Sequence, residues 1–284
     1  MTGRATDADT LGVAAAVSGP PGRPSRPPRL VNRLAWLLVT VAVLASFWHI
    51  DLDWASLARF PAGAWHYAGL MFTPPELAAA PKAAGAMLDS VQMAWVGSVL
   101  GSLVSLPLAF LAAGNIAPRP VRWVLRMVFN IVRAVPELVL AVILLSVTGL
   151  TPFTGALAIG IHSIGTLGKL SYEAIEEADP GPIEAGRAVG SSWLQLVRWS
   201  VWPGVQPQIL SVWLYRFEVN VRASAVLGLI GAGGVGSMLT QNVQFRQWPT
   251  VGMLLVVVIV VTIAIDLGSG AVRRRILTGR WTSR

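Results

Sequence analysis

The chain has 284 residues, of which 54% are hydrophobic and only 13% are charged, and its mean hydropathy is +0.61. Soluble domains carry about a quarter charged residues, so this composition indicates a polytopic membrane protein and argues against a set of soluble domains. Cysteine is absent, which excludes disulfides, thiolate catalysis and cysteine metal sites. The net charge of +8 is explained by basic residues in the predicted cytoplasmic loops. It does not indicate nucleic-acid binding, because the basic residues flank apolar segments.

The N-terminal segment, residues 1–30, is rich in Pro, Gly, Ala and Arg. Repeated proline prevents helix formation and the segment lacks apolar mass, so it is predicted to be a disordered cytoplasmic tail. The apolar run Leu34–Ile50 that follows is too long for the core of a signal peptide and has no cleavage site after it. Residues 31–84 are therefore predicted to contain a first transmembrane helix and an external loop.

Apolar segments of about 20 residues cross a bilayer as helices, and by this criterion the fold is all-α. About six spans are predicted, at residues 33–50, 88–113, 121–148, 153–173, 206–230 and 249–269. The second span carries a row of small residues, Gly97, Gly101 and Ser105, and the fourth contains four glycines. Small residues in membrane helices indicate close helix packing.

Basic residues cluster in four places: the N-terminal tail, the loop after the second span, the region after the fourth span and the C-terminus. With an even number of spans all four clusters lie on one side, which the positive-inside rule assigns to the cytoplasm. Both termini are therefore predicted to be cytoplasmic, with residues 276–284 as a short C-terminal tail.

The polar stretch from residue 174 to Pro203 interrupts the apolar spans on the cytoplasmic side. Asp179-Pro180 is a helix-start signal, Gly190 interrupts the helix, and a second short helix leads to Pro203. Two short helices with a bend are predicted. Glu184 is placed in the first turn, where a carboxylate suits the positive end of the helix dipole. It is interpreted either as the contact for a partner protein or as a charge that serves the helix alone.

Five charged residues lie inside predicted spans: Arg133, Glu137, Arg216, Glu218 and Arg222. Charges in hydrocarbon are costly unless they are paired or face a watery cavity. Arg133 and Glu137 are predicted to share one helix face, and Glu218 and Arg222 have the spacing of a local pair. The two glutamates are interpreted as helix-pairing residues. The arginines either form such pairs or line a path for an anion, because the guanidinium fork suits phosphate-like groups. Pro136 is predicted to kink the third span.

Two glycine motifs resemble nucleotide-binding sequences without their context. Residues 231–236 match GxGxxG at Gly231, Gly233 and Gly236, with Gly234 between them, but no strand precedes them, so an external turn or gate is predicted instead of a dinucleotide site. Gly168-Lys169 lacks the remaining P-loop residues. The three histidines are far apart and predict no metal site. The chain is thus predicted to bind no ATP, metal or cofactor itself.

The polar stretch resembles the cytoplasmic EAA loop of ABC importer permeases, matching at Glu184, Ala185, Gly190 and Pro203. It departs from that motif at Gly186, Ser200 and Trp202. Residues 133–139 and 217–236 are similar to the phosphonate-type permeases of the PhnE family. The resemblance covers residues 85–275, which it identifies as the permease domain.

The resemblance implies a homodimer of permease chains in the cytoplasmic membrane. Two ATPase subunits, which bind ATP and Mg²⁺, would each bind the loop of one permease chain, through permease residues 184–186, 190 and 203. An external binding protein would deliver phosphonate, phosphate or phosphite. The choice among these anions stays open, as does an alternative class, an ATP-independent secondary transporter or channel. A membrane-embedded enzyme is disfavoured because catalytic clusters are lacking.

Overall fold

The computed structural model describes residues 29–49, 53–74 and 76–278, and every regular element in these ranges is helical. The chain divides into two units, one ending at Pro61 and one running from Ala62 to the C-terminus. The first unit contains α1 (Arg29–His49) and the start of α2 (Trp54–Phe72). Residues 1–28 of the predicted tail lie outside the described residues, whereas Arg29 and Leu30 already belong to α1. The predicted external loop contains α2, a helix not foreseen from the sequence.

The centre of the second unit is the pair α3 (Ala80–Ala112) and α6 (Pro152–Glu176). A Cβ atom on Gly97 would lie 2.7 Å from the Ala156 carbonyl oxygen, and one on Gly101 would lie 2.6 Å from Ser163 Cβ. The predicted row of small residues is therefore the contact surface of these two helices, and it brings their backbones close together.

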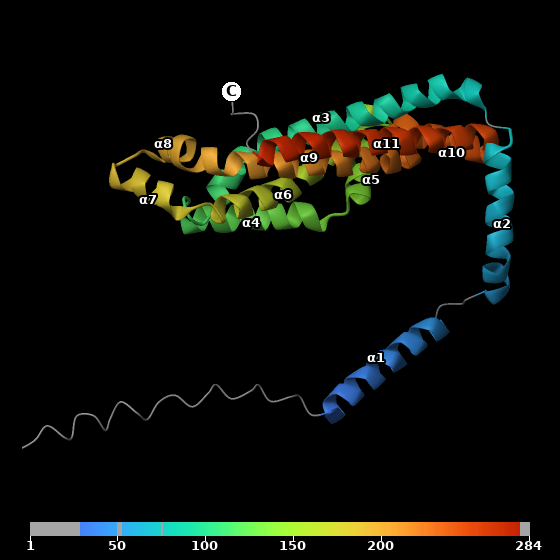
Figure 1. The fold of residues 1–284 in the computed structure, drawn as a ribbon, viewed down its shortest axis with the longest axis horizontal. Helices are drawn as coiled ribbons and strands as arrows, with labels where there is room; N and C mark the ends of the chain where they lie inside the picture. The colour runs from blue at the N-terminus through green and yellow to red at the C-terminus, as the bar shows by residue number, and fades with distance from the viewer. Residues whose placement is uncertain (1–28, 50–52, 75, 279–284) are drawn as a thin grey trace, which may run out of the picture. The chain divides into compact units, whose positions relative to one another are not determined.

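The helices α9 (Trp202–Leu227) and α11 (Trp248–Leu277) pack along this pair, as Figure 1 shows. A π-helical turn, η3 (Gly228–Ala232), connects α9 to α10 (Gly234–Gln244). The second half of α2 reaches the start of α11, where the Tyr67 and Trp248 rings meet edge-on with centroids 4.8 Å apart.

The third predicted span is broken. It forms α4 (Arg119–Ala134) and α5 (Glu137–Thr148), which are bent by 86°. Val135 and Pro136 separate the two helices, because proline disfavours helix at the residue before it and lacks the N–H that would continue α4. The kink predicted at Pro136 is confirmed. Phe129 of α4 is fully buried, and a Cβ atom on Gly168 of α6 would lie 2.5 Å from its ring.

Three helices are long and apolar enough to cross a membrane: α1, the 3₁₀ turn η1 (Leu77–Ala79) joined to α3, and α11. Counting α4–α5 as one bent span, and the helices between Trp193 and Gln244 as another, raises the number to five. The prediction of about six spans is therefore not reached by these criteria among the described residues. The missing one is α6, a continuous helix that is not among the helices passing this test.

Two functional regions lie at opposite ends of the bundle (Figure 1). The short helices α7 (Pro180–Ala188) and α8 (Trp193–Gln195), with the π-helical turn η2 (Leu196–Val201), occupy one end. The loop 113–118 lies at this end, because the Asn115 amide donates to the Ile175 carbonyl at 2.7 Å. The glycine-rich turn and α10 occupy the other end.

Candidate functional site

The polar segment between α6 and α9 folds into two short helices with a bend at Gly190, as predicted. Asp179 caps α7, and its carboxylate accepts a hydrogen bond from the Gly181 N–H at 2.9 Å. Gly190 has φ +74°, a conformation that glycine adopts without a steric penalty. Ser192 then starts the second helix with a capping box.

One detail of the prediction for this segment is wrong. The first turn of α7 contains no acidic residue, and Glu184 lies in the middle of the helix. The reason is that α7 begins at Pro180, whose fixed φ suits the first helical position. The exposed Glu184 carboxylate is therefore beyond the reach of a dipole that acts mainly within the first turn.

Gly186, one of the departures from the EAA motif, is a packing position. It is buried, and a Cβ atom there would lie 2.6 Å from Ser200 Oγ and 2.8 Å from Leu196 Cδ1. Two of the three departures, Gly186 and Ser200, thus face each other where α7 crosses η2. Ile183 on the same face joins Leu196 in the core that extends to α6 and α9.

Polar contacts tie this end to the loop 113–118. Glu176 at the end of α6 forms an ion pair with Arg126 and accepts from the Gly114 N–H at 2.5 Å. Arg187 of α7 donates to the Asn115 carbonyl oxygen. Neither Glu176 nor Asn115 could be singled out from the sequence, because such long-range contacts leave no local pattern.

The segment that carries Glu184 exposes several apolar side chains. Val189 is 81% exposed, Leu194 72% and Trp199 71%, and Ala185 and Pro203 are also exposed. Exposed apolar side chains grouped on a segment that is itself well anchored mark an interaction surface.

A second group of polar residues is buried between four helices. Arg216 of α9 donates through Nε to Ser163 of α6 at 3.3 Å and lies 3.5 Å from Glu137 of α5. Asn220, fully buried one turn further along α9, donates to Ser98 of α3 at 2.8 Å and to Ser163 at 3.1 Å. Ser163 is near the midpoint of α6, so the cluster lies deep within the bundle.

The charges inside the spans do not pair as their spacing predicted. Arg133 ends α4 while Glu137 begins α5, so the 86° break separates them from any common helix face. Glu137 pairs with Arg216 instead, and Arg133 is exposed, with no ion pair among the described residues.

The predicted local pair of Glu218 and Arg222 is also wrong. Glu218 pairs with Arg273 at 2.5 Å, and Arg222 pairs with Asp266 at 3.4 Å. Both partners lie on α11, because α9 packs against that helix along these turns. Asp266 directly follows the uncharged apolar run of the last span. This position in the sequence could have identified it as a candidate partner for an arginine within the bundle.

The glycine-rich turn is tightly packed. Gly231, Gly233 and Gly234 all have positive φ, and a Cβ atom on Gly236 would lie 2.0 Å from the Ala225 carbonyl oxygen. The Val235 N–H donates to Ser90 of α3 at 3.0 Å. No strand precedes the turn in the described part of the chain, in agreement with the rejection of a dinucleotide site.

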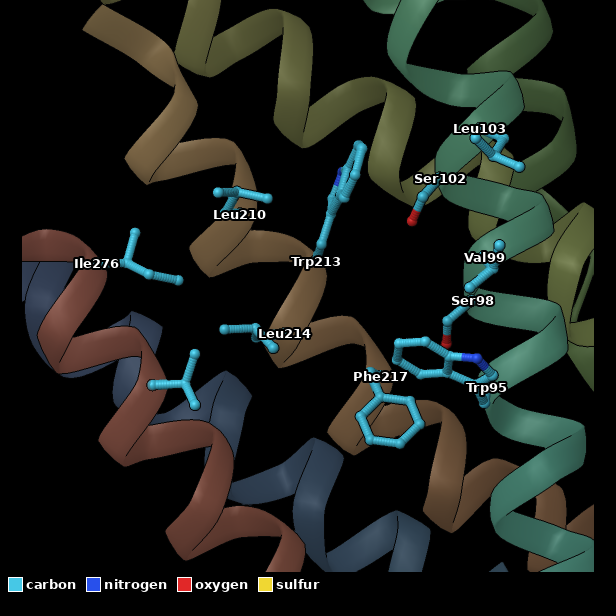
Figure 2. A pocket seen from close by; sticks show the side chains of 11 residues that line it. Trp95, Ser98, Val99, Ser102, Leu103, Leu210, Trp213, Leu214, Phe217 and Ile276 are labelled. Carbon is cyan, nitrogen blue, oxygen red and sulfur yellow. The ribbon is translucent and has the colours of Figure 1, made fainter. Parts of the chain in front are cut away.

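An apolar pocket of about 320 Å³ lies between α3, α9 and α11 (Figure 2). Trp213, Phe217 and Trp95 are among its lining residues, and Ser98 and Ser102 contribute its few polar atoms. Because its walls are almost entirely apolar, this pocket is unsuited to an oxyanion, which needs hydrogen-bond donors.

Residues 105–278, more than half of the chain, match the family of binding-protein-dependent transport system inner membrane components. The chain belongs to this family. It is therefore a multi-pass inner-membrane transport component and not an enzyme. Separately, among the described residues no group of three His, Asp or Glu side chains could hold a metal ion.

Two curated relatives indicate the kind of transport component to which this chain is similar. The phosphate-import permease protein PhnE of Mycolicibacterium smegmatis is 40% identical over 193 residues, which are 68% of this chain and 36% of that protein. The phosphite transport system permease protein PtxC of Stutzerimonas stutzeri is 39% identical over 189 residues, 66% of this chain and 69% of that protein. The chain thus spans about a third of the length of the first relative.

A solved structure supports the fold. An inward-facing MetNI methionine ABC transporter matches with a TM-score of 0.61 at 21% identity, covering 66% of this chain and 93% of that one. The prediction of a phosphonate-type permease is supported by the family and by these relatives.

Proposed function

We propose that this inner-membrane component is the membrane-spanning subunit of an ATP-driven importer of phosphate-like oxyanions: phosphonate, phosphite or phosphate. The two relatives, a phosphate-import permease and a phosphite transport permease, support this substrate class. Arg216, buried within the bundle, supplies donors of the kind that such anions need, whereas the apolar pocket does not.

The chain works as a homodimer with two ATPase subunits, which bind ATP and Mg²⁺, and with an external substrate-binding protein. The observation that carries this assignment is the exposed apolar side chains of the segment that holds Glu184, a segment that is itself anchored to α6. Movement of an ATPase bound there is transmitted through the packed face of Gly186 and Ile183 to α6 and α9. A population shift between inward-open and outward-open states follows.

Orientation follows from the basic residues. Arg126 and Arg187 lie at the bundle end that carries α7 and α8, so we place this end, and both termini, in the cytoplasm. The glycine turn at Gly231, Gly233, Gly234 and Gly236 then lies at the external mouth, where we assign it a gating role.

Transport by the reconstituted system is the direct test. The permease, its ATPase and its binding protein are placed in liposomes, and uptake of labelled phosphate, phosphite and methylphosphonate is measured with and without ATP. Uptake of at least one of these anions only with ATP is expected. Uptake that is independent of ATP, or absent for all three anions, would overturn the proposal.

Glu184→Ala is expected to lower ATP-dependent uptake about tenfold, because a charge-assisted hydrogen bond to the ATPase contributes roughly 1.5–3 kcal/mol. The matched control is Glu177→Ala, which removes an exposed carboxylate from the C-terminal cap of α6. Uptake and co-purification of the ATPase are measured for both variants. Equal uptake in the two variants would show that Glu184 has no role in coupling.

Arg133→Ala and Arg222→Ala are each expected to reduce uptake at least about tenfold, because each removes a cation that an anion meets in the path. Both side chains are exposed, so the complex with the ATPase should still assemble. Lys82→Ala, which removes an exposed cation near the start of α3, serves as the control. Normal uptake in both arginine variants would exclude them from the path.

A further inference from the structure

The break between α4 and α5 leaves the N-terminus of α5 next to the buried Arg216 of α9. No side chain among the described residues caps α5, and the first N–H groups of a helix have no partner within it. The Leu140 N–H is the first to bond back, to the Pro136 carbonyl oxygen. Discontinuous membrane helices commonly direct such termini at anionic ligands, but a terminus alone does not define a site.

The second observation is a set of buried polar atoms at this break without hydrogen-bond partners. Arg216 is only 8% exposed, and its Nη2 atom, directed at the first residue of α5, has no hydrogen-bond partner among the described residues. The same holds for Glu137 Oε1 and His162 Nδ1. Buried polar groups are almost always hydrogen-bonded, so Arg216 Nη2, which reaches only a Glu137 carboxylate oxygen at 3.5 Å, is a donor that can still take a closer acceptor.

The charge balance indicates the sign of that ligand. The Arg133 side chain packs on the same part of α6 as Arg216, since a Cβ atom on Gly165 would lie 3.0 Å from Arg133 Cγ. His162 lies three residues before Gly165 on the same helix. The Arg216 guanidinium and the N-terminus of α5 therefore face one carboxylate, Glu137, and the Arg133 side chain packs on a nearby turn of α6. The excess is positive, and an anion would neutralise it.

We propose that the α4–α5 break is the oxyanion-binding site within the permease, and that Glu137 is an internal counter-ion which the incoming anion displaces from Arg216. This inference rests on the proposed function. Arg216, Arg133 and the free amides of the first turn of α5 donate to the tetrahedral anion, and the His162 ring completes the site. When the site is unloaded, the Glu137 carboxylate stands in for one oxygen pair of the substrate.

The geometry of the pairs supports displacement. Glu137 lies 3.5 Å from Arg216, longer than the 2.7–2.9 Å typical of a charge-assisted hydrogen bond. The Glu218–Arg273 pair of the same bundle is closed to 2.5 Å. A loose pair releases its arginine at lower cost than a tight one. Glu218 is therefore a structural pairing residue, whereas Glu137 competes with the substrate.

The test measures binding of labelled inorganic phosphate to the whole transporter in nanodiscs, without nucleotide and without the binding protein. Phosphite and methylphosphonate serve as competitors. Glu137→Gln removes the competing charge, so phosphate is expected to bind about tenfold more tightly. Arg216→Gln is expected to weaken binding more than about tenfold. Glu218→Gln is the matched control, because it neutralises the other mostly buried glutamate, and its affinity should stay within about twofold of the wild type.

Binding that is unchanged or weakened in Glu137→Gln would overturn the inference, as would an equal tightening in Glu218→Gln, which would indicate a general effect of charge. Glu137→Asp keeps the charge on a shorter arm and is expected to tighten binding to a smaller extent. It provides the same test if Glu137→Gln does not fold. If the wild type imports phosphate but the variants bind phosphate with the same affinity as the wild type, the proposed function stands and only this binding site is excluded.

Discussion

A Gly236→Ala substitution is expected to prevent stable folding of the permease. The added Cβ atom would lie 2.0 Å from the Ala225 carbonyl oxygen and 2.8 Å from the Gly228 backbone. These are backbone atoms at the junction of α9, η3 and α10, so no side chain can rotate away. Overpacking of this kind costs about 3 kcal/mol or more, which exceeds the roughly 1 kcal/mol that alanine gains over glycine in a helix.

The control is the same substitution at Gly268 in α11, where nothing lies within 4 Å of the Cβ position. Gly268→Ala is expected to be neutral or stabilising by up to about 1 kcal/mol. Thermal unfolding of the detergent-purified protein, followed by fluorescence, compares the two. Similar melting temperatures for both variants would mean that the close approach of Gly236 is not required for the fold.

The sequence predicted the elements whose signals are local. Pro136 breaks the third span because of its own ring, Gly190 bends the cytoplasmic segment because of its own backbone freedom, and the row at Gly97 and Gly101 marks a helix contact. The start of α7 at Asp179-Pro180 was predicted correctly, but Glu184 was misplaced, because it lies four residues beyond Pro180 and therefore past the first turn.

The pairing of the buried charges could not be predicted in the same way. The i,i+4 rule assumes that both residues belong to one continuous helix, which fails for Arg133 and Glu137 across the break. For Glu218, the favoured partner, Arg273, is 55 residues away, and its approach depends on how α9 and α11 pack. Only the three-dimensional arrangement brings together the residues of the proposed path.

Arg216→Met is expected to destabilise the permease by about 3 kcal/mol, because it leaves the mostly buried Glu137 carboxylate without a counter-charge. It also removes the donor to Ser163. The double variant Arg216→Met, Glu137→Met replaces both charges by apolar side chains, and such a replacement of a buried ion pair is often neutral or stabilising. Unfolding midpoints in denaturant, measured for both single variants and the double variant, complete a double-mutant cycle.

The same cycle separates stability from transport. If Arg216 served only to neutralise Glu137, the double variant would regain both stability and oxyanion uptake. Because Arg216 also donates to the anion in the proposed path, the double variant is expected to regain most of the lost stability while uptake stays at least about tenfold below the wild type. Full recovery of uptake would reduce the pair to a structural contact. A double variant no more stable than Arg216→Met would show that an unpaired Glu137 is not the cause of the instability.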